Sequence, residues 1–272
     1  MTRFSGHVVV ITGAGSGIGR AAAKAFAAEG SIVHAVDIDH ARSQETAGAL
    51  RLNGTEAWSH QVDVREPDDL ERLAEAVFER HGRCDVLINN AGVGHSGFVH
   101  ELTLEDWRWV LDTNLYGVIH GVHAFVPRMI EQGGGGHILN TASMAGLVAL
   151  PSMAPYSTSK FAVVGLSESL GAELAPHGIA VTAVCPGIVD TNIIDAGRLA
   201  GSDALRDRVA AYYRSRGIPP ERVAADMVAA VRKRRPVAMT AGASYPVLLL
   251  KRLSPRLFRG AASFAVSKIY GR

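Results

Sequence analysis

The chain has 272 residues, 47% hydrophobic and 20% charged, which provides for a sizeable core and excludes a disordered protein. Its formal net charge of +2 conceals an acidic body, with 18 Lys/Arg and 26 Asp/Glu in residues 1–226, and a basic tail, with 10 Lys/Arg and no acid in residues 227–272. We expect no nucleic-acid partner for a chain whose larger part is acidic.

Short runs rich in valine and isoleucine alternate with longer amphipathic stretches, a pattern typical of a parallel α/β sheet. The predicted strands are residues 7–12, 32–37, 57–62, 85–89, 136–141, 179–184 and 236–240. The predicted helices are residues 18–29, 42–52, 67–81, 104–131, 156–175 and 220–234. Because no linker or repeat divides the chain, we expect one doubly wound Rossmann-type domain over residues 1–244, with seven parallel strands and a basic extension at 245–272.

The cysteines and the apolar runs bear on the location of the protein. Cys84 and Cys185 have neither metal-ligand nor disulfide spacing, which favours a reducing, cytoplasmic setting. The apolar run at 7–11 is too short for a signal-peptide core, and no stretch approaches the ~20 apolar residues of a membrane-spanning helix, so we expect a soluble protein. The 11 histidines are scattered without ligand spacing, and we expect no metal.

A glycine-rich turn follows the first predicted strand. Residues 12–19 fit T-G-x-x-x-G-x-G and depart from the G-x-G-x-x-G pattern at residue 18. Amides at the start of a helix can bind a pyrophosphate, and glycines allow close approach of the backbone. We therefore interpret residues 12–19 as a dinucleotide-binding turn, and the alternative is a plain flexible turn without a ligand. The expected cofactor contacts in this turn are Gly13, Ser16, Gly17, Ile18 and Gly19.

An acid ends the second predicted strand. Asp37 lies 18 residues after Gly19, where a carboxylate can accept the adenosine ribose hydroxyls and would repel a 2′-phosphate. Neither Ser16 nor Ile38 is a cation that would attract that phosphate. The sequence therefore predicts NAD in preference to NADP as the cofactor.

Tyr156 and Lys160 lie one helical turn apart in Tyr-Ser-Thr-Ser-Lys. A tyrosine is a poor base at neutral pH because its reference pKa is ~10. A lysine on the same helical face favours the phenolate and so makes the tyrosine usable in proton transfer. Alone, such a pair would usually lie on the exposed face of an amphipathic helix. Its occurrence together with the glycine-rich turn of residues 12–19, which we call the nucleotide seat, favours the catalytic interpretation.

With these motifs in order, residues 5–242 resemble the short-chain dehydrogenase/reductase family. The resemblance implies an active site of Ser143, Tyr156 and Lys160, with Asn114 as a proton-relay residue. It also implies cofactor contacts beyond the glycine-rich turn. These are Asp63, Val64, Asn90, Ala91, Gly92, Pro186, Gly187, Val189 and Thr191. Tyr156 and Lys160 would contact the cofactor as well as act in catalysis.

The resemblance further implies hydride transfer between the nicotinamide and a carbonyl or secondary alcohol. Tyr156 would be the general acid/base, and Lys160 would depress its pKa and hydrogen-bond the nicotinamide ribose. Ser143 would polarise the substrate oxygen, and Asn114 would hold a water that links Lys160 to solvent. Two alternatives use the same residues, a nucleotide-sensing protein with little turnover and an epimerase or dehydratase.

The expected substrate pocket is apolar. Its predicted lining comes from residues 93–94, 144–153 and 188–200, and it includes Leu147, Val148, Leu150, Met153, Ile193 and Ile194. A hydrophobic alcohol or ketone is therefore favoured over a sugar phosphate. Residues 190–217 have no strong strand pattern, and we expect them to form a lid.

The remaining expectations concern partners. Family resemblance implies a homodimer or homotetramer that associates through helices 104–131 and 156–175. We interpret Trp107 and Trp109 as packing or subunit-contact residues. In the extension, a helix is predicted from Ser254 with an apolar stripe beside cations. That pattern suits peripheral contact with an anionic membrane, and the alternative is an arm packed on the body or on a neighbouring subunit.

Overall fold

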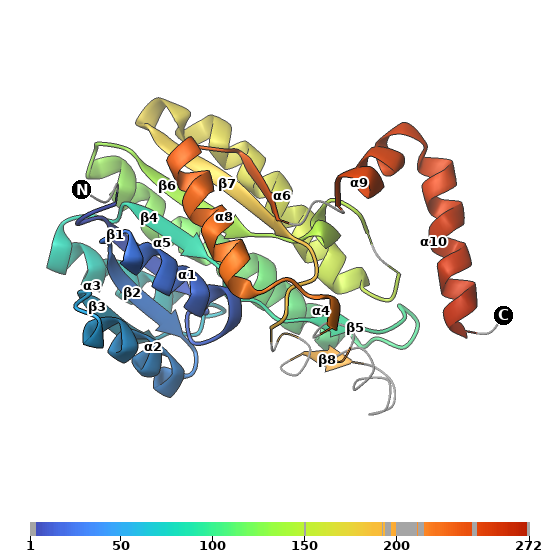
Figure 1. Ribbon diagram of the computed structural model, residues 1–272, viewed down its shortest axis with the longest axis horizontal. Coiled ribbons are helices and arrows are strands. Elements are labelled where there is room, and N and C mark those ends of the chain that lie inside the picture. The colour runs from blue at the N-terminus through green and yellow to red at the C-terminus, as the bar shows by residue number, and fades with distance from the viewer. Residues whose placement is uncertain are drawn as a thin grey trace.

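The computed structural model describes residues 4–149, 151–191, 193, 197–199, 211, 215–240 and 244–270. Seven parallel strands form one sheet in the order β3-β2-β1-β4-β6-β7-β9 (Figure 1). The strands are β1 (Val8–Thr12), β2 (Ile32–Asp37), β3 (Ala57–Gln61), β4 (Val86–Asn89), β6 (Gly136–Thr141), β7 (Ile179–Pro186) and β9 (Val237–Thr240). The predicted α/β fold is confirmed, and the strand order reverses between β1 and β4, where open parallel sheets bind their ligands.

Helices cover both faces of the sheet. They are α1 (Gly17–Ala28), α2 (His40–Leu52), α3 (Pro67–His81), α4 (Leu104–Leu111), α5 (Gly117–Glu131), α6 (Ala154–Leu174) and α8 (Pro220–Lys233). Because side chains alternate along a strand, Val9 and Ile11 of β1 join the core under α1, α2 and α8. Val8 and Val10 join the opposite core under α3, α5 and α6. Burial on both faces explains the nearly continuous apolar runs of the strands.

The predicted single helix over residues 104–131 is wrong in its middle. The structure has α4, then a π-helical turn at Asp112–Tyr116, and then α5. A π turn inserts one extra residue into the helical ladder, and the spacing of apolar residues in the sequence does not reveal it. The turn carries Asn114, the residue for which a role in the active site was predicted.

Two further elements lie outside the main sheet. Strands β5 (His95–Ser96) and β8 (Arg198–Leu199) form a small parallel pair. After β9 the chain continues into α9 (Ser244–Leu253) and α10 (Pro255–Tyr270), and Figure 1 shows α10 standing away from the sheet. The predicted helix after Ser254 is therefore present, and it is preceded by a second helix that was not predicted.

Candidate active site

The glycine-rich turn lies against the end of β4. Thr12 Oγ1 accepts the backbone N–H groups of Asn90 at 2.9 Å and Ala91 at 3.0 Å. Asn90 Nδ2 donates to the carbonyl of Thr12 at 3.0 Å. Two segments 78 residues apart, both predicted to contact the cofactor, are thus joined side by side. The sequence analysis gave Thr12 no role of its own, although it opens the motif.

Two glycines in this turn are required by close contacts. Gly13 has a φ of +65°, and a Cβ there would lie 2.9 Å from the Cα of Ala91. At Gly19 a Cβ would lie 2.1 Å from the carbonyl oxygen of Gly13. No other residue type fits these positions without moving the backbone. The start of α1 is consequently packed directly on the turn.

The first turn of α1 is suited to an anion. Ser16 is the residue before the helix, and its side chain makes no capping hydrogen bond. The first turn contains no acidic residue that would compete for the positive end of the helix dipole. The amides of Gly17, Ile18 and Gly19 are therefore directed at the place where a pyrophosphate would bind.

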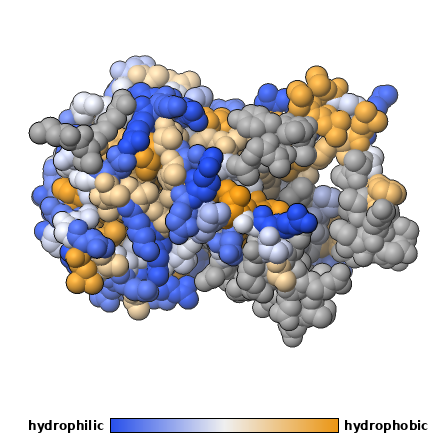
Figure 2. Space-filling model, viewed as in Figure 1, coloured by the Kyte–Doolittle hydropathy of each residue, from blue (hydrophilic) through white to orange (hydrophobic). Residues whose placement is uncertain are grey.

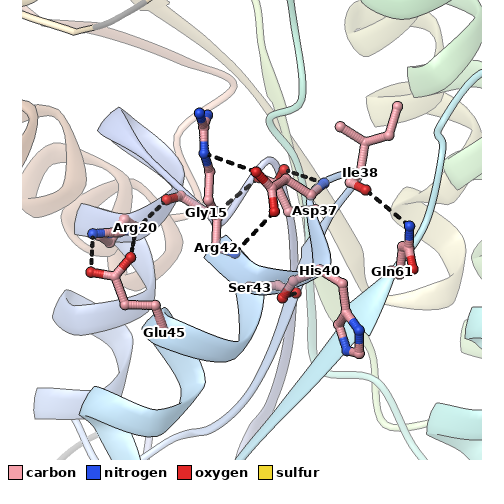
Figure 3. A network of polar contacts seen from close by, with 10 residues as sticks. Gly15, Arg20, Asp37, Ile38, His40, Arg42, Ser43, Glu45 and Gln61 are labelled. Carbon is pink, nitrogen blue, oxygen red and sulfur yellow. Dashed lines mark hydrogen bonds and ion pairs between the residues drawn. The ribbon is translucent and has the colours of Figure 1, made fainter.

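Asp37 is oriented by two backbone amides (Figure 3). Its Oδ2 accepts from the N–H of Gly15 at 2.8 Å, and its Oδ1 accepts from the N–H of Asp39 at 3.0 Å. A carboxylate oxygen has more than one acceptor site, so each oxygen can accept a further hydroxyl. A Cβ at position 15 would lie 2.6 Å from Oδ2, which shows how closely the glycine-rich turn approaches this acid.

The two arginines near Asp37 are already paired with other acids. Arg20 contacts both carboxylate oxygens of Glu45 at 3.0 and 2.9 Å. The Nε of Arg42 lies 3.1 Å from Asp39 Oδ2. Figure 3 shows the Arg20–Glu45 pair and Arg42 close to Asp37. Each of the two arginines thus has an acid partner of its own beside Asp37.

Asp63 and Val64 follow β3. Arg65 holds the Asp63 carboxylate through Nε at 2.9 and 3.0 Å, and this pairing lowers the pKa of Asp63. Val64 is 7% exposed, and its carbonyl oxygen lies 2.9 Å from the Nδ1 of His120. The structure thus places Asp63 in an ion pair with its near neighbour in the sequence, which the motif alone did not indicate.

Asn114 and Gly92 meet beside the buried lysine. Asn114 is fully buried, its Oδ1 accepts from Val93 N at 2.7 Å, and its Nδ2 donates to Val93 O at 2.9 Å. A Cβ at Gly92 would lie 3.0 Å from Asn114 Oδ1 and 3.6 Å from Lys160 Nζ. The π turn therefore brings Asn114 to the same glycine that Lys160 approaches. The Nδ2 of Asn114 also reaches Ser159 Oγ at 3.4 Å, a contact that the sequence analysis missed.

Tyr156 and Lys160 lie on one face of α6. Lys160 is 4% exposed, and its Nζ donates to the carbonyl of Thr141 at 2.7 Å and lies 5.7 Å from the centre of the Tyr156 ring. Burial lowers the pKa of Lys160 to about 8, and the neighbouring Cys185 acts in the opposite direction. The ammonium group is thus held in a desolvated position beside the phenol, where its charge acts strongly.

Ser143 follows β6 in an extended conformation and precedes the short 3₁₀ turn Met144–Gly146. Its Oγ accepts from Ala145 N at 3.1 Å. A Cβ at Gly146 would lie 2.5 Å from the carbonyl of Lys160, so the turn packs directly on α6. The carbonyl that binds Lys160 is that of Thr141, only two residues before Ser143, and the segment is therefore fixed to the lysine at two points.

The segment after β7 returns to the glycine-rich turn. Gly187 N donates to Thr240 O at 3.2 Å, and Val189 is 5% exposed and pairs with Ile218. Thr191 Cγ2 would lie 3.1 Å from a Cβ at Gly17. The Pro186–Thr191 motif and the nucleotide seat thus meet in space, which neither motif shows by itself.

Comparison with known proteins identifies the family. A family model described as short chain dehydrogenase matches residues 7–199. The chain belongs to the short-chain dehydrogenase family. The chain is 37% identical over 270 residues to the probable oxidoreductase EphD of Mycobacterium tuberculosis, covering 97% of the chain and 46% of that relative. It therefore spans about half the length of that relative.

Other relatives match over most of both chains. The meso-2,3-butanediol dehydrogenase of Serratia marcescens is 37% identical over 225 residues, which cover 83% of this chain and 87% of that protein. A short-chain dehydrogenase/reductase of Burkholderia phymatum, solved with NAD, has a TM-score of 0.88 and 36% identity, covering 94% and 96% of the chains. A single-residue variant of actinorhodin polyketide ketoreductase, solved with NADPH, has a TM-score of 0.74 and 36% identity, covering 86% and 94%. These solved relatives support a nicotinamide cofactor for this member of the family.

The small β5–β8 pair adds a group of contacts that the sequence analysis missed. The guanidinium of Arg198 lies 4.5 Å from the centre of a ring of Trp109 and 3.5 Å from Asp106 Oδ1. Asp106 in turn lies 3.4 Å from the Nε2 of the buried His95. Trp109 therefore packs against an arginine that lies 89 residues further along the chain. The structure thus supplies the partner of Trp109 within the chain, whereas its role as a subunit contact stays a prediction.

Strand β5 also reaches the start of α6. Gly97 N donates to the carbonyl of Ser152 at 2.7 Å, and Gly97 pairs with Met153, which directly precedes α6. Ser152 has a φ of +59°, an uncommon value for a residue with a side chain. Of the predicted pocket lining and lid, Leu150, Ile194 and most of residues 190–217 lie outside the described residues.

Proposed function

We propose that this protein transfers a hydride between NAD and a hydrophobic secondary alcohol or the matching ketone. The observation that carries the proposal is the buried Lys160, which lies next to Tyr156 on α6 and is bonded to the segment that bears Ser143. A family fold alone would not specify chemistry, because function resides in the site. The three side chains fit proton transfer to or from a substrate oxygen.

The nucleotide seat fits a dinucleotide. The contacts at Gly13 and Gly19 leave backbone rather than side chains facing the crevice, and the open first turn of α1 suits a pyrophosphate. Asp37 would accept the ribose hydroxyls, and residues 90–92 and 186–191 would hold the nicotinamide end. When bound, the nicotinamide supplies or accepts the hydride.

The chain's own residues would handle the proton. Tyr156 would give the proton to, or take it from, the substrate oxygen, and Ser143 would donate a hydrogen bond to that oxygen as charge develops. The ammonium of Lys160 would stabilise the phenolate of Tyr156. Asn114 would act as a positioning residue, because its amide fixes Val93 and lies beside Lys160.

The direct test removes the phenolic hydroxyl. Tyr156→Phe should lower kcat about 1,000-fold for a secondary alcohol that the wild type oxidises, since general acid–base catalysis contributes roughly 10²–10⁴-fold. NADH formation is followed with a panel of hydrophobic alcohols, and NAD binding is measured separately. Tyr116→Phe, at a tyrosine that is 49% exposed, is the matched control and should retain activity. An active Tyr156→Phe enzyme would refute the proposed role, and NAD binding without turnover on any alcohol or ketone would favour the nucleotide-sensing alternative.

We propose NAD as the preferred cofactor on electrostatic grounds. The orientation of Asp37 and the pairing of Arg20 and Arg42 with other acids support it, because a 2′-phosphate would meet a carboxylate and no free cation there. Asp37→Ser should lower the ratio of kcat/KM with NAD to that with NADP by at least about tenfold. Asp68→Ser changes an exposed acid in the first turn of α3, away from Arg20 and Arg42, and it should leave the ratio unchanged. An unchanged ratio in Asp37→Ser would remove the basis for the preference.

We also propose an apolar substrate and self-association. Leu147 and the buried Val148 follow Ser143, and their apolar character supports a hydrophobic alcohol. Exposed apolar side chains on α4, the π turn, α5 and α6 support a homodimer or homotetramer through these helices. They are Leu104, Tyr116, Ile119 and Phe161. The two buried, unpaired thiols, Cys84 and Cys185, support a reducing, cytoplasmic setting.

A further inference from the structure

The carboxy-terminal arm, residues 244–270 with α9 and α10, combines exposed apolar side chains with cations only. Its charged residues are Lys251, Arg252, Arg256, Arg259 and Lys268. Its large exposed apolar side chains are Leu249 (57%), Leu250 (41%), Leu253 (76%), Leu257 (66%) and Phe264 (62%). So many exposed apolar side chains on one helix pair are typical of a surface that binds another protein or a membrane.

One residue holds α9 to the body of the molecule. Lys251 Nζ donates to the carbonyl of Leu147 at 2.6 Å and lies 4.4 Å from the centre of the Phe161 ring. Desolvation at this contact lowers the pKa of Lys251. Leu249 and Leu253 are one turn apart and lie roughly 160–200° around the helix from Lys251, because each residue advances the helix by about 100°. The Lys251 face is thus pinned inward, and the leucine face is turned away from the body.

The apolar face continues onto α10. Leu257 and Phe264 are seven residues apart and share one side of that helix. Arg256 lies about 90° around the helix from them, and Arg259 lies on the opposite side, because each residue advances the helix by about 100°. Figure 2 shows orange side chains beside blue ones around the junction of α9 and α10, at the upper right. None of the helices in the described part of the chain is long and apolar enough to cross a membrane. Amphipathic helices with cations beside an apolar stripe can bind in the interface of a membrane.

We propose that the arm binds the surface of an anionic lipid bilayer, with its leucines in the interface and its arginines at the headgroups. Charge complementarity supports this occupant. Residues 244–270 contain five cations and no acid, which matches a continuous negative surface. A second copy, whose body is also acidic overall, would in addition have to offer a groove for five separate apolar side chains.

The attachment point gives this docking a consequence for substrate. Leu147 lies four residues after Ser143, and Phe161 follows Lys160, so the docked arm would bring this end of the molecule to the lipid. Resting on the proposed function, this makes a membrane-dissolved alcohol or ketone the substrate class. Binding to vesicles can be measured without turnover. Failure of the arm proposal, seen as loss of vesicle binding, is therefore distinguished from failure of the proposed reaction, seen as absence of NADH formation.

The test is co-sedimentation of the full chain with phosphatidylglycerol vesicles and with phosphatidylcholine vesicles at low ionic strength. The double variant L253S/L257S should bind phosphatidylglycerol vesicles at least about tenfold more weakly than the wild type. The matched control is L52S/V99S, which removes two apolar side chains that are 90% and 62% exposed and lie outside both the arm and the proposed self-association surface, and it should bind within about twofold of the wild type. Retained NAD binding shows that both variants are folded.

Three outcomes would overturn the proposal. The wild type could fail to bind phosphatidylglycerol vesicles, or it could bind phosphatidylcholine vesicles equally well, which would remove the electrostatic basis. In the third, L253S/L257S lowers the mass of the oligomer in solution without changing lipid binding, and the arm is then a contact between copies of this chain. The proposal is supported if only the arm variant binds the vesicles more weakly than the wild type. It also requires that added salt releases the wild type from the phosphatidylglycerol vesicles.

Discussion

The nucleotide half of the molecule, residues 8–92, and the half that contains the predicted substrate pocket, residues 93–199, differ in how they are held together. In the first half, backbone meets backbone at glycines, and Thr12 and Asn90 add hydrogen bonds between neighbouring strand ends. In the second half a glycine also meets backbone, at Gly146, but long side chains in addition join segments far apart, as with Arg198 on Trp109 and Lys251 of the arm on Leu147. A backbone-built site depends on spacing in the sequence, whereas a side-chain-built site depends on the tertiary fold.

The difference has a consequence for tolerance to change. Where a Cβ has no room, one methyl group displaces the backbone that forms the site. Where an arginine stacks on a ring, its loss leaves the backbone in place and removes a stabilising contact of modest size. The predictions below test this contrast, from the largest expected effect to the smallest.

Gly19→Ala should weaken NAD binding about 100-fold, the upper end of the ~1–3 kcal/mol that overpacking costs. The added Cβ would lie 2.1 Å from Gly13 O, and α1 would have to move away from the turn. Isothermal titration with NAD measures the change. Gly48→Ala in α2 is the control, because the nearest atom to its Cβ is 4.0 Å away, and it should bind NAD like the wild type. Equal affinities in the two variants would contradict the account of the nucleotide half.

Acid should destabilise both halves through buried histidines. Burial and His60 lower the pKa of His34 to about 3, and burial lowers the pKa of His60 and of His137 to about 4. The unfolded chain then binds protons below about pH 6.5 that the folded chain refuses, so stability falls as pH drops from there to about pH 4. Near pH 5 a buried histidine with a pKa of about 4 costs about 2 kcal/mol.

Denaturant unfolding at about pH 7 and about pH 5 measures this effect, and a substitution assigns it to a half. His34 Nδ1 and His60 Nε2 are 2.9 Å apart in the nucleotide half, so they cannot both be charged without repulsion. His137, whose Nε2 is 2.7 Å from Thr182 Oγ1, lies in β6. His60→Gln should reduce the loss of stability between the two pH values more than His137→Gln, because it also relieves His34. The reverse order would contradict the assignment.

Arg198→Ala should raise KM for the alcohol about three- to tenfold, since an arginine–aromatic contact contributes about 0.5–1 kcal/mol or more when desolvated. Arg198 is a positioning residue that ties β8 to α4 and, through β5, to the start of α6. The NAD affinity should stay unchanged, which a general loss of stability would not allow. Arg80→Ala removes the other arginine–tryptophan contact, 3.8 Å over Trp58, and should leave KM for the alcohol as it is. Equal changes of KM in the two variants would show that the effect is not specific to the contact of β8 with α4.

The sequence by itself determined the sheet, the glycine-rich turn between β1 and α1, and the placement of Tyr156 and Lys160 on one helical face. These features rest on contacts with fixed local rules: alternation along buried strands, glycine where a backbone must approach, and two side chains one helical turn apart. The predicted strands agree with the observed ones to within a residue or two at their ends. Helix α3 also begins at the predicted Pro67 and ends before Gly82, whose φ is +66°.

Only the tertiary structure decided how distant segments complete the site. It introduced the π turn that brings Asn114 to Gly92 and the contact of Arg198 with Trp109. It also placed α9 on the loop after Ser143, through two residues 104 positions apart. Such contacts follow from no local rule, because many surface arginines and lysines could reach a ring or a carbonyl, and the packing of the whole chain selects one partner for each.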